Sequence, residues 1–205
     1  MRARLLEATV EVLLERGFAN TTTTLVSERA GVSRGAQLHH FPTKNELVVA
    51  AVAHVMERRA EDLRAAVAEL QGAPTRKVIR MLGDYFASPG FKAALELWVA
   101  ARTDPELLAT VGPFERHLGR ETHLLTVELL GADESQPGVR ELIQATLDLC
   151  RGLGLADTLS DDTRRRARIL DEWAKVVDRQ LTGLQRQAEG TQDSHSRPVG
   201  AEEAR

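Results

Sequence analysis

The segment SERAGVSRGAQLHHFPTK, residues 27–44, predicts two short helices joined by a tight turn. Gly31 stands where the first helix must end and reverse, and glycine tolerates the positive φ that such a turn needs. Ser33 is a good N-cap for the next helix, which then offers Arg34 and Gly35. Two such helices at a steep angle form a helix-turn-helix, whose second helix reads DNA in the major groove.

The charge distribution agrees with a nucleic-acid-binding head. No acidic residue occurs from Arg29 to Asn45, although the net charge of the chain is -3. Residues 1–60 hold eight Lys or Arg and six Asp or Glu, so the excess of acidic residues lies in the remainder. A slightly basic N-terminal part on an acidic body has the sign expected for binding DNA.

The composition predicts an all-α protein. Of the 205 residues, 42% are hydrophobic and only 4% aromatic, and Ala, Leu, Arg and Glu dominate. Glu7 and Glu11 interrupt the apolar N-terminus, which excludes a signal peptide and a membrane span, and the single Cys150 suits the reducing cytoplasm. We find no enzyme signature and expect no cofactor. His39 and His40 point about 100° apart on a helix and make a poor metal-chelating pair.

The remaining breakers and caps define further helices. A first helix over residues 2–16 ends at Gly17, with Phe18 in the core, and one residue of the run Thr21–Thr24 caps a helix over 22–30. Thr43 and Glu46 form a capping box that opens a helix reaching residue 70. Further helices are expected over 74–87, 90–103, 105–130, 138–157 and 162–187, the third of them kinked or split at Pro113.

These elements predict three parts: a helix-turn-helix domain at 1–45, a helical ligand-binding and dimerisation domain at 46–187, and a disordered tail at 188–205. Two apolar stripes in the last helices predict a homodimer that pairs as a four-helix bundle. The stripes consist of Leu142, Ile143, Thr146, Leu149 and Leu153, and of Leu170, Trp173, Val177 and Leu181. The alternative is that both stripes face the chain's own core. Close backbone approach would explain Gly152 and Gly154 in this region.

The middle helices gather most of the aromatic side chains. One interpretation is a cavity for a small apolar effector, and the other is ordinary core. Glu96 or His117 would be a polar anchor in the first case and solvent-exposed in the second. The candidate residues are Met81, Tyr85, Phe86, Phe91, Glu96, Trp98, Phe114 and His117.

Residues 3–50 resemble the DNA-binding domain of the TetR (tetracycline repressor) family of bacterial regulators. The resemblance rests on the order and spacing of several short elements. These are Leu5-Leu6-Glu7-Ala8, Gly17-Phe18, the threonine run, Ala30-Gly31-Val32-Ser33, Gly35-Ala36, His40-Phe41, Lys44 and Leu47. The rest of the chain matches the family only in its helix pattern.

The resemblance implies a role for each matching position. A threonine among Thr22, Thr23 and Thr24 would hold a phosphate at a helix N-terminus. His40 and Lys44 would hold phosphates as well, Lys44 from the first turn of the long helix. Arg34 would read a base, and Ser33, Gly35 and His39 would line the groove or the backbone. The family commonly has an aliphatic residue and then a phosphate-binding Tyr where this chain has Gln37 and Leu38. We therefore expect Gln37 or His39 to take over part of that contact, Gln37 also to read sequence, and Leu38 to pack inward.

The sequence thus predicts a cytoplasmic, ligand-responsive, DNA-binding transcriptional regulator. We expect a homodimeric repressor that binds a palindromic double-stranded operator and an unknown, apolar small-molecule effector. The alternative is a helical interaction module whose N-terminal unit contacts a protein. Salt dependence separates the two, because phosphate contacts release counterions and their affinity falls steeply with added salt.

Overall fold

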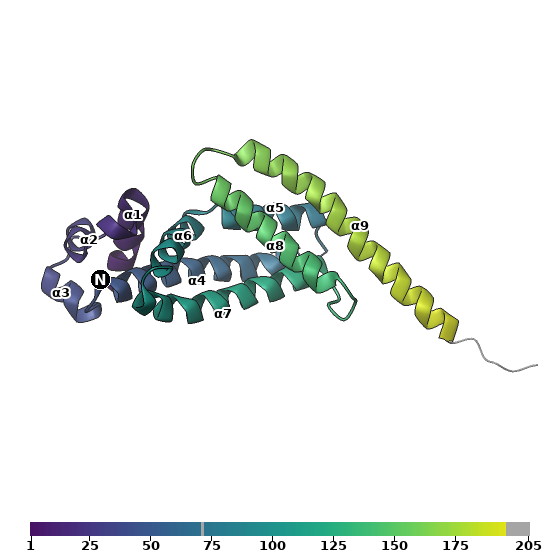
Figure 1. The fold of residues 1–205 in the computed structure, drawn as a ribbon, viewed down its shortest axis with the longest axis horizontal. Helices are drawn as coiled ribbons and strands as arrows, with labels where there is room; N and C mark the ends of the chain where they lie inside the picture. Colours follow the sequence, from purple (N-terminus) through teal and green to yellow (C-terminus); the bar gives the residue numbers. More distant parts are fainter. Residues whose placement is uncertain (71, 196–205) are drawn as a thin grey trace, which may run out of the picture.

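Helices account for the regular structure of the chain. The computed structural model describes residues 1–70 and 72–195, without the side chains of 59, 62, 63, 65–70 and 184–195. Over these residues it contains nine helices and no strand, which confirms the all-α prediction (Figure 1). The helices are α1 (Arg2–Asn20), α2 (Thr23–Ala30), α3 (Arg34–His40), α4 (Lys44–Leu70), α5 (Thr75–Phe86), α6 (Pro89–Ala101), α7 (Pro105–Leu130), α8 (Val139–Ala156) and α9 (Thr163–His195).

Caps fix the two short helices as the sequence predicts. Thr22 is the threonine that caps α2, its hydroxyl accepting a hydrogen bond from the Leu25 amide at 3.2 Å. Gly31 ends this helix with a left-handed φ of 62°, which costs a glycine nothing. Ser33 caps α3 by accepting from the Ala36 amide at 3.2 Å. These contacts set the angle between α2 and α3.

The capping box at the start of α4 is also present. The Thr43 hydroxyl accepts from the Glu46 amide at 3.1 Å, and a Glu46 carboxylate oxygen accepts from the Thr43 amide at 3.2 Å. From this cap α4 runs out of the three-helix head and into the body, where it lies alongside α7 (Figure 1). One helix therefore belongs to both parts of the molecule.

The C-terminal end of α1 forms a junction between head and body. Gly17 breaks the helix with a φ of 72°, and one further turn reaches Asn20. The Lys44 ammonium donates to the carbonyl oxygens of Phe18, at 2.5 Å, and Ala19, at 3.3 Å, and lies 4.2 Å from the centre of the Phe18 ring. Glu96 of α6 accepts from the Phe18 amide at 3.3 Å. We call Phe18, Lys44 and Glu96 the Phe18 junction; it joins α1, α4 and α6.

Two expectations about the later helices need correction. Pro113 does not split α7, which is assigned as one helix from Pro105 to Leu130. Neighbouring turns keep the helix together although the proline lacks an amide hydrogen. The last helix continues to His195, beyond the expected end at 187. The rest of the expected disordered tail, residues 196–205, lies outside the described residues.

The C-terminal helix is attached to the body by a charged pair of contacts. Both Arg76 and Arg80 of α5 bind the Asp171 carboxylate through two hydrogen bonds each, at 2.6–3.0 Å. These bonds hold the pKa of Asp171 well below its usual range. Bidentate contacts of this kind fix orientation as well as distance, so α9 has a defined position on α5.

Close backbone approach explains one of the two glycines of α8. A Cβ atom on Gly154 would lie 2.1 Å from the carbonyl oxygen of Phe86, whereas a Cβ on Gly152 meets nothing within 4 Å. The prediction of close approach is therefore confirmed for Gly154 and is wrong for Gly152 within one protomer. The contact brings α8 against the end of α5.

Gly154→Ala is expected to destabilise the protein, because its new methyl group would collide with a backbone carbonyl that cannot rotate away. We expect a loss of about 2 kcal/mol or more in the free energy of unfolding, in the range of overpacked cores. The matched control is Gly119→Ala in α7, where a Cβ meets nothing within 4 Å. That change should stabilise by about 0.5–1 kcal/mol. Urea titrations followed by circular dichroism measure both; equal effects would refute the close contact.

Lys44→Met is expected to loosen the Phe18 junction while keeping a side chain over the Phe18 ring. It removes two charge-assisted hydrogen bonds to the end of α1, and because Lys44 is only partly buried we expect a loss of about 1 kcal/mol. Amide hydrogen exchange of residues 17–21 should accelerate by about fivefold. Lys77→Met on the exposed face of α5 is the control. Unchanged exchange in Lys44→Met would show that the ammonium does not hold the junction.

Candidate DNA-binding surface and effector cavity

The outer surface of the head is formed by α3. Ser33, Arg34, Gly35, His39 and His40 are all exposed on it. Within the described part of the chain no carboxylate forms an ion pair with Arg34, so its guanidinium is available to a ligand. Figure 1 shows α3 at the end of the molecule away from α9. The structure thus collects five of the predicted DNA-contacting residues on one protruding helix.

Two neighbouring residues of α3 lie on the opposite sides from those expected. Gln37 is 0% exposed, and its side-chain amide donates to the Phe41 carbonyl oxygen at 2.7 Å. It caps the end of α3 from inside and cannot read a base or hold a phosphate in this position. Leu38 is 42% exposed, so the expectation that it packs inward is wrong. Successive helical residues point about 100° apart, and α3 turns Gln37 rather than Leu38 to the core.

The predicted phosphate contacts are divided by the structure. Thr22 and Thr24 are exposed and Thr23 is half-buried at the N-terminus of α2, where backbone amides attract anions. His40 is exposed as well. The Lys44 ammonium instead binds the carbonyl oxygens of Phe18 and Ala19, because the last carbonyls of a helix attract a cation. Lys44 therefore has a structural partner where a phosphate was expected.

The predicted apolar effector cavity is filled by its own rings. Tyr85, Phe86 and Phe91 are buried, and the ring centres of Phe86 and Phe91 lie 5.1 Å apart in an edge-to-face contact. The Trp98 ring packs against Phe91 in the same way at 5.6 Å. Edge-to-face contacts are a favourable way for aromatic rings to fill a core. Of the two interpretations of these rings, the structure therefore agrees with ordinary core.

The other members of that predicted cavity are dispersed. Met81 and Phe114 pack at the margin of the core, Glu96 belongs to the Phe18 junction, and His117 is exposed. Sequence reasoning missed Glu115, which hydrogen-bonds to Trp98 and whose pKa burial raises above its usual range. A periodic pattern gave no sign of this half-buried acid, because it directly follows Phe114 on a helix that carries several charged residues there.

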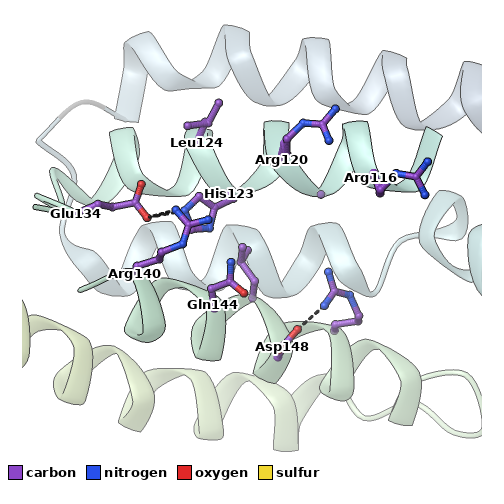
Figure 2. A pocket seen from close by; sticks show the side chains of 11 residues that line it. Arg116, Arg120, His123, Leu124, Glu134, Arg140, Gln144 and Asp148 are labelled. Carbon is purple, nitrogen blue, oxygen red and sulfur yellow. Dashed lines mark hydrogen bonds and ion pairs between the residues drawn. The ribbon is translucent and has the colours of Figure 1, made fainter. Parts of the chain in front are cut away.

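A cavity of about 450 Å³ opens elsewhere, between α7 and α8. Figure 2 shows side chains from both helices, and Glu134 from the loop between them, arranged around it. Arginine dominates its wall, with Arg116 and Arg120 on α7 and Arg140 and Arg151 on α8. His123 lies between them and its Nε2 is 2.7 Å from a Glu134 carboxylate oxygen. The sequence analysis assigned none of these residues to a site; their only signal is helical spacing along two separate helices.

The predicted dimerisation stripes are mostly part of the protomer's own core. Ile143, Thr146, Leu153, Leu170, Val177 and Leu181 are buried within a single chain, so their assignment to an interface is wrong. Each stripe is the core-facing side of an amphipathic helix, which has the same period as an interface. Leu142, Leu149 and Trp173 are only half-buried, and Trp173 donates from its indole to the Thr146 hydroxyl at 3.0 Å.

An apolar surface that shares two residues with the predicted stripes faces outward on the last two helices. Leu149 of α8 and Ile169, Trp173 and Val176 of α9 line a shallow hollow bordered by charged side chains. We call these four residues the α8–α9 face. It overlaps the predicted stripes at Leu149 and Trp173 and adds Ile169 and Val176, which each precede a buried stripe residue of α9.

The head matches a known family of regulators. The family model for bacterial regulatory proteins of the tetR family matches residues 5–51. The HTH-type transcriptional regulator CymR of Pseudomonas putida is 30% identical over 184 residues, which cover 86% of this chain and 88% of that protein.

Solved structures have the same fold. A putative transcriptional regulator from Pseudomonas aeruginosa PAO1 superposes with a TM-score of 0.67 at 25% identity, over 91% of this chain and 92% of that one. The multidrug binding protein EbrR, complexed with ethidium, superposes with a TM-score of 0.60 at 24% identity, over 84% of this chain and 96% of that one.

The two kinds of comparison agree with each other and with the geometry of the head. No membrane-length apolar helix is found among the described residues. The relatives are transcriptional regulators, and none of them supports the alternative of a module that contacts another protein. The chain therefore belongs to the TetR family of bacterial regulatory proteins and is a helix-turn-helix, DNA-binding transcriptional regulator.

Proposed function

We propose that this regulator is a homodimeric repressor that binds a palindromic operator in the cytoplasm and leaves it when a small molecule binds in the body. The observation that carries the DNA-binding part is the exposed face of α3. There Arg34 is the only long basic side chain, and it lies beside the small residues Ser33 and Gly35. A guanidinium matches guanine O6 and N7, and small neighbours let the helix approach the base edges.

Dimerisation supplies the second half of the operator contact. A single head reads a few base pairs, and two heads related by two-fold symmetry read half-sites about 34–36 Å apart. The α8–α9 face supports this assembly, because its four large apolar residues are only half-buried in one protomer. Two such helix pairs would pack as a four-helix bundle and remove this surface from water.

The route from body to head runs through α4 and the Phe18 junction. The α4 helix begins under the last turn of α1 and then packs against α7. A change in the position of α7 would be transmitted along this helix to the spacing of the two heads. An effector needs different affinities for the operator-bound and free arrangements in order to shift the equilibrium between them. The bound ethidium of EbrR supports a small-molecule site within this fold.

Arg34→Ala is expected to weaken binding to the preferred operator by about 1–3 kcal/mol, because it removes a bidentate base contact. The operator is first obtained by selecting bound sequences from random DNA with the wild-type protein. Fluorescence anisotropy then compares that operator with variants at each position. The preference should relax at one position in each half-site.

Arg102→Ala, which removes an exposed charge from the end of α6, is the control for a general loss of positive charge. It should leave both affinity and preference unchanged. Equal affinities and equal preferences for Arg34→Ala and wild type would exclude Arg34 from base reading.

Leu149→Glu and Val176→Glu are expected to give monomers, because each places an unpaired charge in the centre of an apolar interface. Sedimentation velocity should show about half the mass of wild type, with unchanged far-UV circular dichroism, since both residues face outward from the protomer. Val99→Glu, at an apolar residue of α6 that is 68% exposed, is the control and should remain dimeric. A dimer in both interface variants would place the assembly on another surface.

A further inference from the structure

The cavity between α7 and α8 has the size of a ligand site. Its volume is about 450 Å³, within the range of about 300–1,000 Å³ common for small-molecule pockets. Residues spaced by one or two helical turns supply each wall: Arg116, Arg120 and His123 from α7, and Arg140, Gln144 and Asp148 from α8 (Figure 2). Two rigid helices therefore hold its polar groups, which favours a fixed geometry over an adaptable surface.

The charge of the cavity is positive beyond what its own acids balance. Glu134 is paired with His123, at 2.7 Å, and with Arg140, at 3.4 Å. Asp148 is paired with Arg151. No carboxylate of the described residues lies within ion-pair distance of Arg116 or Arg120, which both line the cavity. Both arginines are solvent-exposed, so their guanidinium groups are free to bind an anion that enters the cavity.

Two buried nitrogen atoms in the wall also lack partners among the described residues. The His123 side chain is 9% exposed, its Nε2 faces Glu134, and its Nδ1 has no hydrogen-bond partner. The Nε atom of Arg151 is buried without a partner as well. Buried polar atoms in folded proteins are nearly always hydrogen-bonded, so these two unpaired atoms show that the polar groups of this wall are not fully satisfied by the described residues.

The chemical groups that line the cavity indicate the class of ligand. Guanidinium groups bind carboxylate and phosphate groups through two parallel hydrogen bonds. The buried side chain of Leu147 and the side chain of Leu124 add apolar wall beside the arginines. A small molecule with one anionic group and a compact apolar body fits both the guanidinium groups and the apolar wall. This differs from the apolar effector that the sequence predicts, because the aromatic cluster is packed and the cavity that is open is cationic.

The cavity is placed where it can influence the head. Glu121 of α7, one residue along from the cavity residue Arg120, forms an ion pair with Arg64 of α4 at 3.1 Å. A ligand that draws Arg116 and Arg120 toward α8 would pull on the helix that packs against α4. Helices α7 and α4 would then move relative to the heads.

We propose that the cavity between α7 and α8 is the effector site of this regulator and that the effector is a small organic anion held by Arg116 and Arg120. This proposal rests on the proposed ligand-responsive function and names the class of ligand. The α8–α9 face lies on the other side of α8, at Leu149, so the site is open in a dimer assembled through that face.

The test uses the full chain and five probes at constant ionic strength. Benzoate, hexanoate and phenyl phosphate carry the anionic group, and benzamide and hexanamide are their neutral matches. Calorimetric titration should show binding of at least one anion and of neither amide. A response to phenyl phosphate alone identifies a phosphate headgroup and a response to the carboxylates identifies a carboxylate, and either outcome supports the proposal.

The variant Arg116→Gln/Arg120→Gln should bind the anion about tenfold to a hundredfold more weakly, the effect expected for loss of charge-assisted hydrogen bonds. The control Arg102→Gln/Arg164→Gln removes the same charge from exposed positions outside the cavity and should bind as wild type does. Equal weakening in the two double variants would reveal general charge attraction and overturn the proposal. Binding of the neutral amides as strongly as of the anions, or of no probe at all, would also overturn it.

Operator binding separates this proposal from the proposed function. Wild type without any anion should bind the selected operator. If it does not, the proposed repressor function is refuted, and calorimetry alone then decides whether the cavity binds an anion. If wild type binds the operator, saturating anion should lower its affinity by about 5- to 150-fold, the usual range of allosteric coupling. The Arg116→Gln/Arg120→Gln protein should bind the operator but ignore the anion. An anion that binds without releasing the operator would overturn the effector role.

Discussion

The Phe18 junction is the constraint on which the relation of head to body depends. The last carbonyl groups of α1 lie beyond its regular ladder of hydrogen bonds; that of Phe18 accepts from the Thr21 amide at 3.3 Å, and poorly satisfied buried carbonyls are costly. The Lys44 ammonium satisfies two of them, and the carboxylate of Glu96 takes the Phe18 amide on the other side. The burial that lowers the pKa of Lys44 is the cost of this arrangement. Three helices distant in sequence are thereby fixed to one residue, and any movement of α4 or α6 must act on the head there.

Features set by neighbouring residues were predictable from the sequence. Gly17, Gly31, Ser33 and the Thr43–Glu46 box act within one helical turn, so their identity defines the local backbone, and the structure places helix ends at or beside them. The same holds for the family, whose pattern consists of such local signals in a fixed order. Features that depend on which side of a helix faces the core were less accessible. Gln37 is buried and Leu38 is exposed, the reverse of the expectation, because neighbouring residues of a helix point about 100° apart. Helix α3 is too short to show an apolar period that would have told the two apart.

Sites built from two helices were not predictable. Arg116 and Arg120 are ordinary surface residues of a long helix until α8 brings Arg140 and Arg151 opposite them. The aromatic residues gave the reverse error, because large apolar side chains can line a cavity or fill it and composition does not distinguish the two. The apolar stripes of α8 and α9 are ambiguous for the same reason. In the sequence, Val177 and Leu149 are equally good candidates for a core or an interface position, and only the packing of the helices buries Val177 and leaves Leu149 half-exposed.

The attachment of α9 to α5 has a genetic consequence. Arg76 and Arg80 hold Asp171 within a single protomer, and Leu170 and Val177 are buried in that same chain, so a protomer orders its last helix without help from a partner. In the proposed homodimer, a chain with a damaged head would therefore keep an intact assembly surface. A cell that also makes the wild-type protein would then contain mixed dimers with only one working head. Mutations at Arg34 should accordingly behave as dominant alleles, whereas mutations that disrupt α9 should behave as recessive ones.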